Sequence, residues 1–390
     1  MKRNLGMPSA ANNAKHVVIV QRRLTHYRVP FFEELRRALA ARDIKLTLVY
    51  GNPTRREASK DDGADLPWGI KVPCKYFLSD RLCLQWFVPQ AKNADLVILT
   101  HENKLIANLW AQYAMSNLRV GLWGHGANLQ GSKDSIREIF KRRTALRADW
   151  WFGYTEMSRG LILSTGYPAD RISIVENSID SLALATEYTA ALDAKLNNAI
   201  STEMACEAPT AAYIGSLYKE KRLEFLFEAA VRIKEIIPKF RLVVAGAGPD
   251  KSIVESFVGR NPWVRYVGPV DDQNKALILA ESKVLLNPGL VGLGILDSFV
   301  CQTPMITTDC GIHSPEISYL ENGKNGVITN NDIHSFVRET VRVLQDSNYR
   351  NHLVNGCKKS ALHYTVENMA ANFADGIISC LNSAPLRSQK

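Results

Sequence analysis

The sequence predicts an α/β protein with two doubly wound, Rossmann-like domains that face each other across a cleft. The chain has 390 residues, which exceeds the size at which a single hydrophobic core usually stops growing. Short β-rich runs alternate with helical patterns along the whole chain. Several of these runs are continuously apolar, as is typical of parallel strands that are covered on both faces.

Each half of the chain contains about six predicted strands. In the first half they lie at residues 16–21, 45–50, 95–100, 119–123, 150–154 and 172–176, with a helical pattern at 30–41. In the second half the strands lie at 211–214, 241–245, 264–268, 283–287, 305–308 and 326–329, and the helices at 221–236, 272–281, 295–301 and 332–345. Because crossovers between parallel strands are right-handed, each set predicts one open, doubly wound sheet.

The domain boundary is predicted in the polar stretch at residues 181–209, which is rich in Ala, Asn and Thr. We expect an N-terminal domain at residues 1–195, a C-terminal domain at 196–365, and a final segment at 366–390 whose helix packs back on one of the domains, with the N-terminal domain as the expected partner. In open α/β sheets, ligands bind beyond the carboxyl ends of the strands. We therefore expect the functional residues at the carboxyl ends of the predicted strands.

Composition restricts the partners and the compartment. The net charge of +9 and the isoelectric point near 9.1 suggest a phosphorylated small molecule, a membrane surface or a nucleic acid. The basic residues are not interleaved with aromatic ones, so no nucleic acid is expected. Seven cysteines without a C-x-x-C pair predict a reducing cytoplasm. The sequence shows neither an apolar leader nor 18 consecutive apolar residues, so we expect no secretory signal and no membrane span.

The glycine-rich stretch NPGLVGLGILDSF, residues 287–299, follows a predicted strand and opens a helix. Gly289, Gly292 and Gly294 permit close approach of a ligand, and the free N–H groups of a first helical turn favour a phosphate. A carboxylate repels phosphate, so Asp297 is better suited to accept hydrogen bonds from sugar hydroxyls. The alternative is a tight turn in which Asp297 only complements the helix dipole.

A second candidate phosphate site lies in YIGSLYKEKRLEFLFEAA, residues 213–230. A strand ends at Gly215, and Lys219, Lys221 and Arg222 precede an amphipathic helix; lysine and arginine both suit a diphosphate. A solvated charged turn is the alternative. The nearby G-x-G-P turn at residues 246–249 lacks the third glycine of a dinucleotide fingerprint.

The N-terminal half contributes His125, which lies between two glycines at the end of a predicted strand. The loop after the first strand is crowded with basic residues that face either an anionic acceptor or open solvent: Arg22, Arg23, His26 and Arg28. Glu316 starts a short helix, where it either joins Asp297 in a pocket for hydroxyls or complements the helix dipole. The basic stretch at 136–151 is either a peripheral membrane helix or a plain surface helix.

No zinc-ligand spacing, P-loop or G-x-S-x-G elbow is found in the sequence. The motifs that are present resemble, in order, those of the retaining nucleotide-sugar glycosyltransferases of family 4, which have the GT-B fold, and in particular those acting on bacterial cell-surface polysaccharides. The stretch ISIVENSID resembles the family's N-x-x-D segment, and residues 213–230 resemble G-R-L-x-x-x-K-G-x-x-x-L-I-x-A. Residues 289–326 resemble the long E-G-F-G-L-x-x-x-E-A-x-x-x-G-x-P-V-I segment and the G-x-x-E-I that follows it.

The sequence departs from the family pattern at five positions. Anchored on Pro304, the second acid of the family's pair is Asp297, whereas the first falls on Gly289. In the family the first acid is associated with the donor sugar. Ser216 replaces the family's arginine, and either Arg222, which stands in the family's glycine position, or Lys219 is expected to supply that charge. Gln302 stands where a glycine is usual.

The resemblance implies a metal-independent hexosyltransferase that moves a sugar from a UDP- or GDP-linked donor to a hydroxyl of a glycan or lipid-linked glycan, with retention. It implies that the catalytic residues are His125 and Lys221, and that the acceptor-side residues are Arg22, Arg23, His26 and Arg28. The implied donor-binding residues are Gly215, Ser216, Lys221, Arg222, Gly292, Leu293, Gly294, Asp297 and Glu316. No cofactor is implied, and the protein is expected in the cytoplasm, with a peripheral position on the inner face of the membrane as an option.

Two other functions agree with the sequence. One is a nucleotide-sugar enzyme of the same fold that does not glycosylate, such as an epimerase. The other is a catalytically inactive partner of a glycosyltransferase, which the glycine at position 289 suggests.

Overall fold

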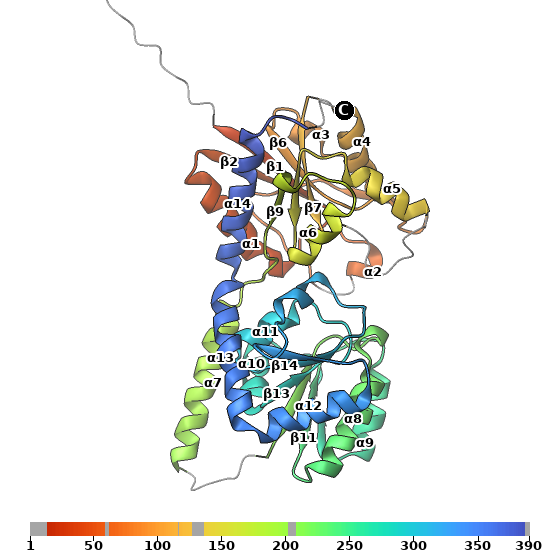
Figure 1. Cartoon of the computed structure of the whole chain (residues 1–390). Helices are drawn as coiled ribbons and strands as arrows, with labels where there is room; N and C mark the ends of the chain where they lie inside the picture. The colour runs from red at the N-terminus through yellow and green to blue at the C-terminus, as the bar shows by residue number, and fades with distance from the viewer. Residues whose placement is uncertain (1–13, 59–61, 116, 127–135, 202–207, 387–390) are drawn as a thin grey trace, which may run out of the picture.

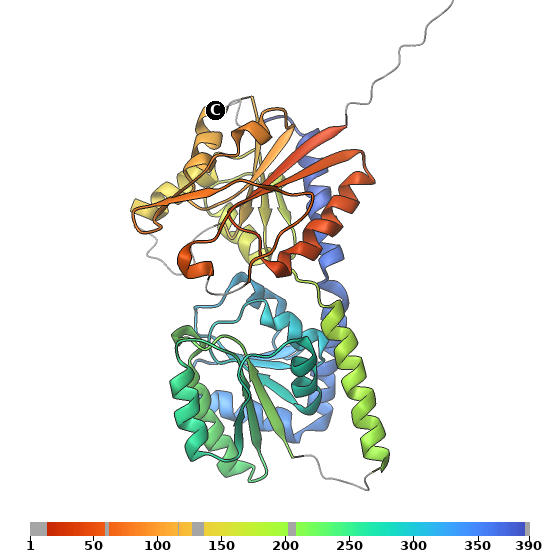
Figure 2. The same cartoon turned by 180° about the vertical axis from the view of Figure 1, so that it is seen from behind.

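A computed structural model describes residues 14–58, 62–115, 117–126, 136–201 and 208–386 of the chain. These residues form two α/β domains stacked end to end (Figures 1 and 2). On one side of the molecule, α14 (Val366–Asn382) lies beside the N-terminal domain and α7 (Leu182–Ser201) lies beside the C-terminal domain. No helix of the described part is long and apolar enough to cross a bilayer.

The N-terminal domain is built on a seven-stranded parallel sheet in the order β3-β2-β1-β6-β7-β8-β9. Its strands are β1 (Lys15–Gln21), β2 (Ile44–Tyr50), β3 (Ile70–Lys71), β6 (Leu96–Thr100), β7 (Arg119–Gly124), β8 (Trp150–Gly153) and β9 (Ile172–Ile174), and β4 (Cys74–Phe77) and β5 (Leu82–Gln85) form a separate antiparallel hairpin. The central strands are buried on both faces, as their uninterrupted apolar runs predict. The helices are η1 (His26–Arg28), α1 (Val29–Ala40), α2 (Arg55–Ala58), α3 (Val88–Ala91), α4 (Ile106–Ala114), α5 (Ile136–Ala145), α6 (Glu156–Leu163) and η2 (Ala169–Arg171).

The C-terminal domain has a six-stranded parallel sheet in the order β12-β11-β10-β13-β14-β15. Its strands are β10 (Thr210–Ile214), β11 (Arg241–Ala245), β12 (Val264–Tyr266), β13 (Val284–Leu286), β14 (Met305–Thr308) and β15 (Gly326–Thr329). The helices are η3 (Lys219–Lys221), α8 (Leu223–Ile236), α9 (Lys251–Arg260), α10 (Asp272–Glu281), α11 (Gly294–Val300), η4 (Pro315–Tyr319), α12 (Ile333–Gln345) and α13 (Ser347–His363). Asp271, Asp332 and Asp346 cap three of these helices by accepting backbone N–H bonds.

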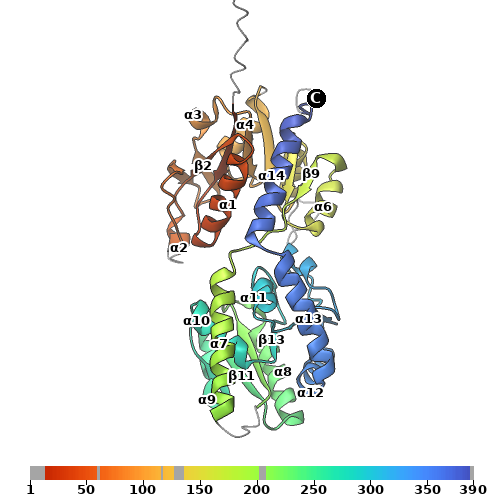
Figure 3. The ribbon, with the colours of Figure 1, turned by 90° about the vertical axis from the view of Figure 1, so that its left-hand side faces the viewer.

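The predicted interdomain linker is largely helical. Residues 182–201 form α7 (Leu182–Ser201), which packs along α10, so the predicted boundary at residue 195 falls inside this helix (Figure 3). Leu184, Tyr188 and Ala191 are buried at a helical spacing of four and three residues. This spacing of apolar residues indicates a helix, but the many polar residues around them favoured a linker.

The final helix, α14 (Val366–Asn382), crosses to the N-terminal domain and lies against α1 and β9 (Figure 3). Phe373 of α14 stacks on Phe152 with ring centroids 4.5 Å apart, and both rings are fully buried. The chain therefore passes between the domains twice. The crossings are the 175–181 segment and the junction of α13 and α14.

Candidate functional site

The glycine-rich turn between β13 and α11 is held at the carboxyl edge of the C-terminal sheet by neighbouring backbone. The N–H of Leu290 donates to the carbonyl of Glu220 at 2.8 Å, and the N–H of Ser314 donates to the carbonyl of Val291 at 2.9 Å. His313 adds a side-chain contact, because its Nδ1 accepts from the N–H of Val291 at 3.1 Å. The turn is thereby fixed against η3, which contains Lys221.

Gly289 is the tightest point of this contact. A β-carbon at position 289 would lie 2.2 Å from the carbonyl oxygen of Glu220 and 2.6 Å from the carbonyl carbon of Lys221. Such distances to backbone atoms exclude any side chain unless η3 or the turn moves. The missing first acid therefore has a steric reason in this chain.

Lys221 places a partly buried ammonium group at this edge. Its Nζ donates to the carbonyl of Leu290, and no carboxylate of the described residues lies within ion-pair distance. Burial lowers the pKa of Lys221 to about 8. A cation that is desolvated without a counter-ion favours binding of an external anion.

Arg222 follows directly and adopts a left-handed backbone conformation with φ of 56°. This conformation costs a non-glycine residue roughly 1–2 kcal/mol. It directs the guanidinium toward the turn, where the side chain donates to the carbonyl of Pro288, to Thr308 Oγ1 and to Asn331 Oδ1. The guanidinium carbon also lies 4.4 Å from the ring centroid of Phe225, and no ion pair with a described acid is formed.

The other donor-binding residues predicted in the two glycine-containing turns also lie at the carboxyl edge of the C-terminal sheet. Among the described residues, the backbone N–H groups of Gly292, Leu293 and Gly294 meet no protein acceptor. Gly215 and Ser216 follow β10, and the carbonyl of Ser216 accepts from the hydroxyl of Tyr213 at 2.9 Å. The structure thus brings these five residues, Lys221 and Arg222 to one end of the sheet.

Asp297 has a protein partner that the sequence analysis missed. Its carboxylate lies 3.2 Å from Nζ of Lys275 on α10, and Lys275 also contacts Asp272 at 3.0 Å. Burial raises the pKa of Asp297, and the lysine counteracts part of this effect. Asp297 contacts Lys275, whereas Glu316 contacts Asn177. The two carboxylates therefore do not contact each other.

Glu316 is buried at the junction of the domains. Its Oε1 accepts from Nδ2 of Asn177 at 2.6 Å, and Oδ1 of the same asparagine accepts from the guanidinium of Arg28 at 2.6 Å. The hydroxyl of Tyr319 donates to the carbonyl of Asn177 at 3.1 Å. Asn177 opens the N-x-x-D segment, so this motif connects the loop after β1 to η4.

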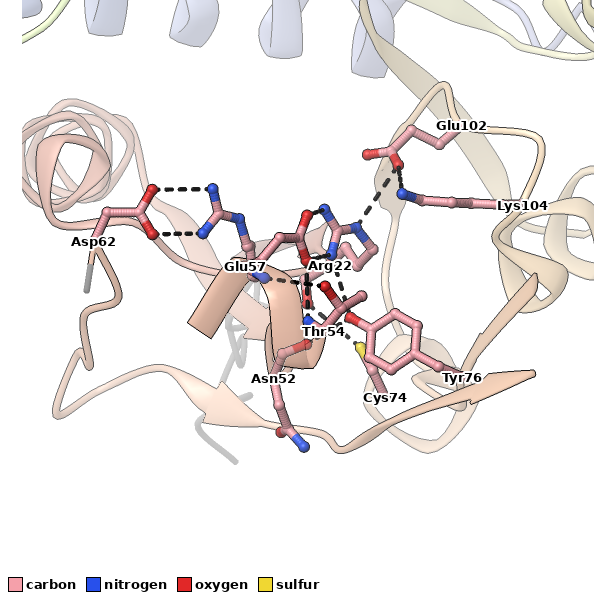
Figure 4. A network of polar contacts seen from close by, with 10 residues as sticks. Arg22, Asn52, Thr54, Glu57, Asp62, Cys74, Tyr76, Glu102 and Lys104 are labelled. Carbon is pink, nitrogen blue, oxygen red and sulfur yellow. Dashed lines mark hydrogen bonds and ion pairs between the residues drawn. The ribbon is translucent and has the colours of Figure 1, made fainter. Parts of the chain in front are cut away.

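The other basic residues of the loop after β1 are partly neutralised by acids (Figure 4). Arg22 forms a two-pronged ion pair with Glu57 at 2.6 and 2.7 Å, lies 3.7 Å from Glu102, and donates to the hydroxyl of Tyr76. Arg23 pairs in the same manner with Asp62 at 2.6 and 3.1 Å. The bond from Arg22 lowers the pKa of Glu57 to about 2. The loop therefore offers a nearly balanced set of charges, with an ion-pair network in place of free arginines.

His125 lies apart from this network, whereas the backbone N–H of His26 donates to the carbonyl of Asp62 at 3.0 Å. His125 follows β7 at the carboxyl edge of the N-terminal sheet, with the ring of Tyr154 at 4.5 Å. The side chain of His125 is accessible to solvent at one surface. Desolvation by the surrounding protein atoms is the largest cause that lowers the pKa of its imidazole to about 4, and the charges of Lys141 and Arg28 lower it further. The imidazole is therefore neutral at physiological pH. His26 is an exposed residue whose ring contacts Tyr27.

Several residues at this site were not predicted from the sequence: Glu57, Asp62, Asn177, Lys275 and His313. Asn177 lies in a motif that was noted, and its polar side chain after a strand was an available signal. The others come from separate elements and show no local pattern. A separate hollow lined by Ala191, Lys195 and Arg241 lies at the amino ends of β10 and β11, away from these residues.

Residues 208–346 match the family model for glycosyl transferases group 1. O-antigen chain mannosyltransferase B of Escherichia coli is 24% identical over 206 residues, or 50% of this chain and 51% of that protein. The putative glycosyltransferase EpsD of Bacillus subtilis (strain 168) is 29% identical over 168 residues, or 40% of this chain and 43% of that protein. The aligned regions thus span about half or less of these relatives.

Solved structures resemble nearly the whole chain. The Anabaena protein Alr3699/HepE in complex with UDP superposes with a TM-score of 0.66 at 12% identity and covers 94% of this chain and all of that chain. The lipopolysaccharide outer core galactosyltransferase WaaB gives a TM-score of 0.64 at 15% identity over 93% of this chain and 99% of that chain. At these identities the likeness establishes the fold. It confirms the predicted GT-B architecture of two Rossmann-like domains.

Proposed function

We propose that this protein transfers a sugar from a nucleotide diphosphate donor of the UDP or GDP type to a hydroxyl of a glycan or lipid-linked glycan. The observation that carries the proposal is Lys221, a partly buried ammonium at the carboxyl edge of the C-terminal sheet that has no carboxylate partner among the residues the structure describes. Burying a charge without a counter-ion is costly. A diphosphate at this position supplies the missing negative charge.

The diphosphate leaves with the nucleotide when the sugar is transferred, and negative charge develops on its outer phosphate. Lys221, Arg222 and the free N–H groups of Gly292, Leu293 and Gly294 form a set of donors at one place. Donors that are fixed before the reaction stabilise this developing charge most effectively. Because two cationic side chains serve the diphosphate, we expect transfer to proceed without a divalent metal.

The remaining donor contacts follow from hydroxyl chemistry. Asp297 accepts hydrogen bonds from the ribose hydroxyls, and the ammonium of Lys275 offsets part of the rise in its pKa that burial causes. Glu316 lies at the domain junction, where it faces Asn177. With position 289 blocked, the donor sugar must be held by groups other than the first acid of the family pair.

The acceptor side is assigned to the N-terminal sheet edge. His125 is neutral at physiological pH, which permits its ring nitrogens to donate to and accept from sugar hydroxyls. The network around Arg22 is nearly balanced in charge, which suits a neutral sugar better than a phosphate (Figure 4). The proposal that the acceptor is a cell-surface glycan is supported by the O-antigen and outer core functions named for the relatives. Retention follows from the resemblance to family 4, and the cytoplasm remains the expected compartment.

Binding of UDP and GDP to the purified protein tests the donor site directly. We expect one of them to raise the thermal midpoint and to bind with a Kd in the micromolar range, and Lys221→Ala to weaken that binding at least tenfold. Lys251→Ala is the matched control, because Lys251 lies on the surface of α9 and pairs with Glu255. Equal nucleotide affinity in wild type and Lys221→Ala contradicts the proposed site.

Product analysis then separates transfer from its rivals. Proton NMR of a reaction with nucleotide sugar and no acceptor reveals an epimerase by a changed sugar. An acceptor panel in the presence of EDTA tests metal-independent transfer, and the anomeric coupling of the product reports retention or inversion. Nucleotide binding without turnover of any donor favours an inactive partner.

A further inference from the structure

Helices α4 and α5 present an apolar surface to solvent on the N-terminal domain. Six large apolar side chains on or beside these helices are each between 38% and 51% exposed: Trp86, Ile106, Trp110, Tyr113, Ile139 and Phe140. Residues 106, 110 and 113 share one face of α4, while Ala107, Ala111 and Gln112 fill the opposite face. We refer to these six residues, together with Arg143 and Arg147, as the α4–α5 face.

Direct contacts join the two helices into one surface. Nε2 of Gln112 on α4 donates to the carbonyl of Thr144 on α5 at 3.1 Å. The guanidinium of Arg147 lies 5.2 Å from the ring centroid of Tyr113, and the rings of Trp86 and Trp110 are 5.2 Å apart. Figures 1 and 2 show α4 and α5 on the side of the domain that is remote from α14. The face is therefore not covered by another part of the described chain.

The described charged side chains of this surface all carry positive charge. Arg142, Arg143 and Arg147 are exposed, and the described side chains at 106–114 and 139–147 include no acid. The surface of α1 differs, because Glu34 pairs there with Arg37. Exposed aromatic residues beside unopposed arginines are typical of a surface that lies in the headgroup region of an anionic bilayer.

We propose that the α4–α5 face binds the surface of a membrane that contains anionic lipid. The aromatic and aliphatic side chains enter the interface while the arginines contact lipid phosphates. A second copy of this chain fits less well, because a symmetric contact opposes arginine to arginine. The face also adjoins the acceptor edge, since Ile106 begins α4 directly after the loop that carries Glu102 and Lys104.

This location gives the proposal a functional consequence. Glu102 contacts Arg22, so the loop between the α4–α5 face and the Arg22 network is only a few residues long (Figure 4). A lipid-linked acceptor at the bilayer surface then reaches the cleft without being extracted from the membrane. The binding itself does not depend on glycosyl transfer, so the two proposals are tested by different measurements.

Cosedimentation of the full chain with vesicles tests the proposal. Vesicles of phosphatidylcholine alone are compared with vesicles containing phosphatidylglycerol, at low and at high salt. We expect binding only to the anionic vesicles, and its loss in high salt, where screening shortens the reach of charges. Arg143→Glu/Arg147→Glu is expected to reduce partitioning at least tenfold, since each basic residue contributes on the order of fivefold. Trp110→Ser/Phe140→Ser tests the apolar contribution and is also expected to weaken binding.

Matched variants on the C-terminal domain provide the controls. Lys239→Glu/Arg265→Glu makes the same change of charge, and Ile236→Ser/Leu277→Ser removes exposed apolar side chains elsewhere. Both controls are expected to bind as the wild type does, and unchanged nucleotide-induced thermal shifts show that all variants are folded. Absence of wild-type binding to anionic vesicles overturns the proposal, as does an equal loss in the controls. If sedimentation velocity instead shows that the α4–α5 variants dissociate a dimer, a protein contact covers this face and the membrane proposal is wrong.

Discussion

Gly289 and Lys221 are in such close backbone contact that a β-carbon on the glycine would lie 2.6 Å from the carbonyl carbon of the lysine. This contact links two features of the sequence. The residue type that replaces the family's first acid is the one that allows η3 to approach the turn, and η3 carries the lysine assigned to the diphosphate. The glycine is therefore a packing requirement of the proposed donor site.

Substitution of Gly289 by alanine is expected to destabilise the protein by about 1–3 kcal/mol, as overpacking against rigid backbone does. Displacement of η3 also moves Lys221, so nucleotide affinity should fall together with the thermal midpoint. Differential scanning fluorimetry with and without UDP and GDP measures both effects. Gly259→Ala on α9 is the control, because nothing lies within 4 Å of its added carbon. A stable Gly289→Glu variant with improved activity would refute the packing argument.

Lys221→Met should make the protein more stable near pH 7 and less able to bind nucleotide. The pKa of Lys221 is about 8 in the folded chain, against 10.5 for an exposed lysine. Between these values the unfolded chain binds more protons than the folded chain, so this lysine's contribution to stability rises with pH. It is fully present above pH 10.5 and is lost as the pH falls through 8. The advantage of Lys221→Met should therefore shrink from pH 7 toward pH 10.5.

Urea unfolding of both proteins at several pH values tests this, because the difference between them cancels other titrating groups. In parallel, calorimetric titration should show the wild-type nucleotide affinity declining above about pH 8, as the amine loses its proton. Lys251→Met is the surface control, because Lys251 lies on α9 and pairs with Glu255. A pH-independent difference for Lys221→Met would contradict the assigned environment.

The sequence predicted helices and strands better than it predicted which side chains contact each other. Apolar strands such as β1 and β6 are recognisable because their pattern is local. The helix α7 was missed because its buried residues are few among Ala, Asn and Thr. Glu57 lies 35 positions from Arg22, and no rule of periodicity joins them. The prediction that Arg22 contacts an anionic acceptor required a free guanidinium. In the structure this guanidinium is paired with Glu57 of α2.

The Lys275–Asp297 pair should behave as a coupled unit. Lys275→Met leaves the mostly buried carboxylate of Asp297 without its cation. We expect the free energy of unfolding to fall by about 2–3 kcal/mol, because removing one partner of a buried ion pair leaves an uncompensated charge. Lys275→Met/Asp297→Leu should recover much of that stability while nucleotide affinity stays low. Urea unfolding of the two single variants and the double variant gives the coupling energy. Additive effects would show that the two side chains do not interact.

The amide of Asn177 should determine how the domains are held together. In Asn177→Asp, the new carboxylate keeps the contact with Arg28 but loses the bond to Glu316 and opposes it with like charge. We expect a loss of about 2–3 kcal/mol at neutral pH, with a lower thermal midpoint and a larger radius of gyration by small-angle scattering. The loss should diminish as the pH falls, because a shared proton relieves the repulsion and protonation is then favoured in the folded state. Asn177→Asp/Glu316→Gln reverses the direction of the bond and should restore stability. If Asn177→Asp/Glu316→Gln is no more stable than Asn177→Asp, the contact between residues 177 and 316 does not hold the domains together.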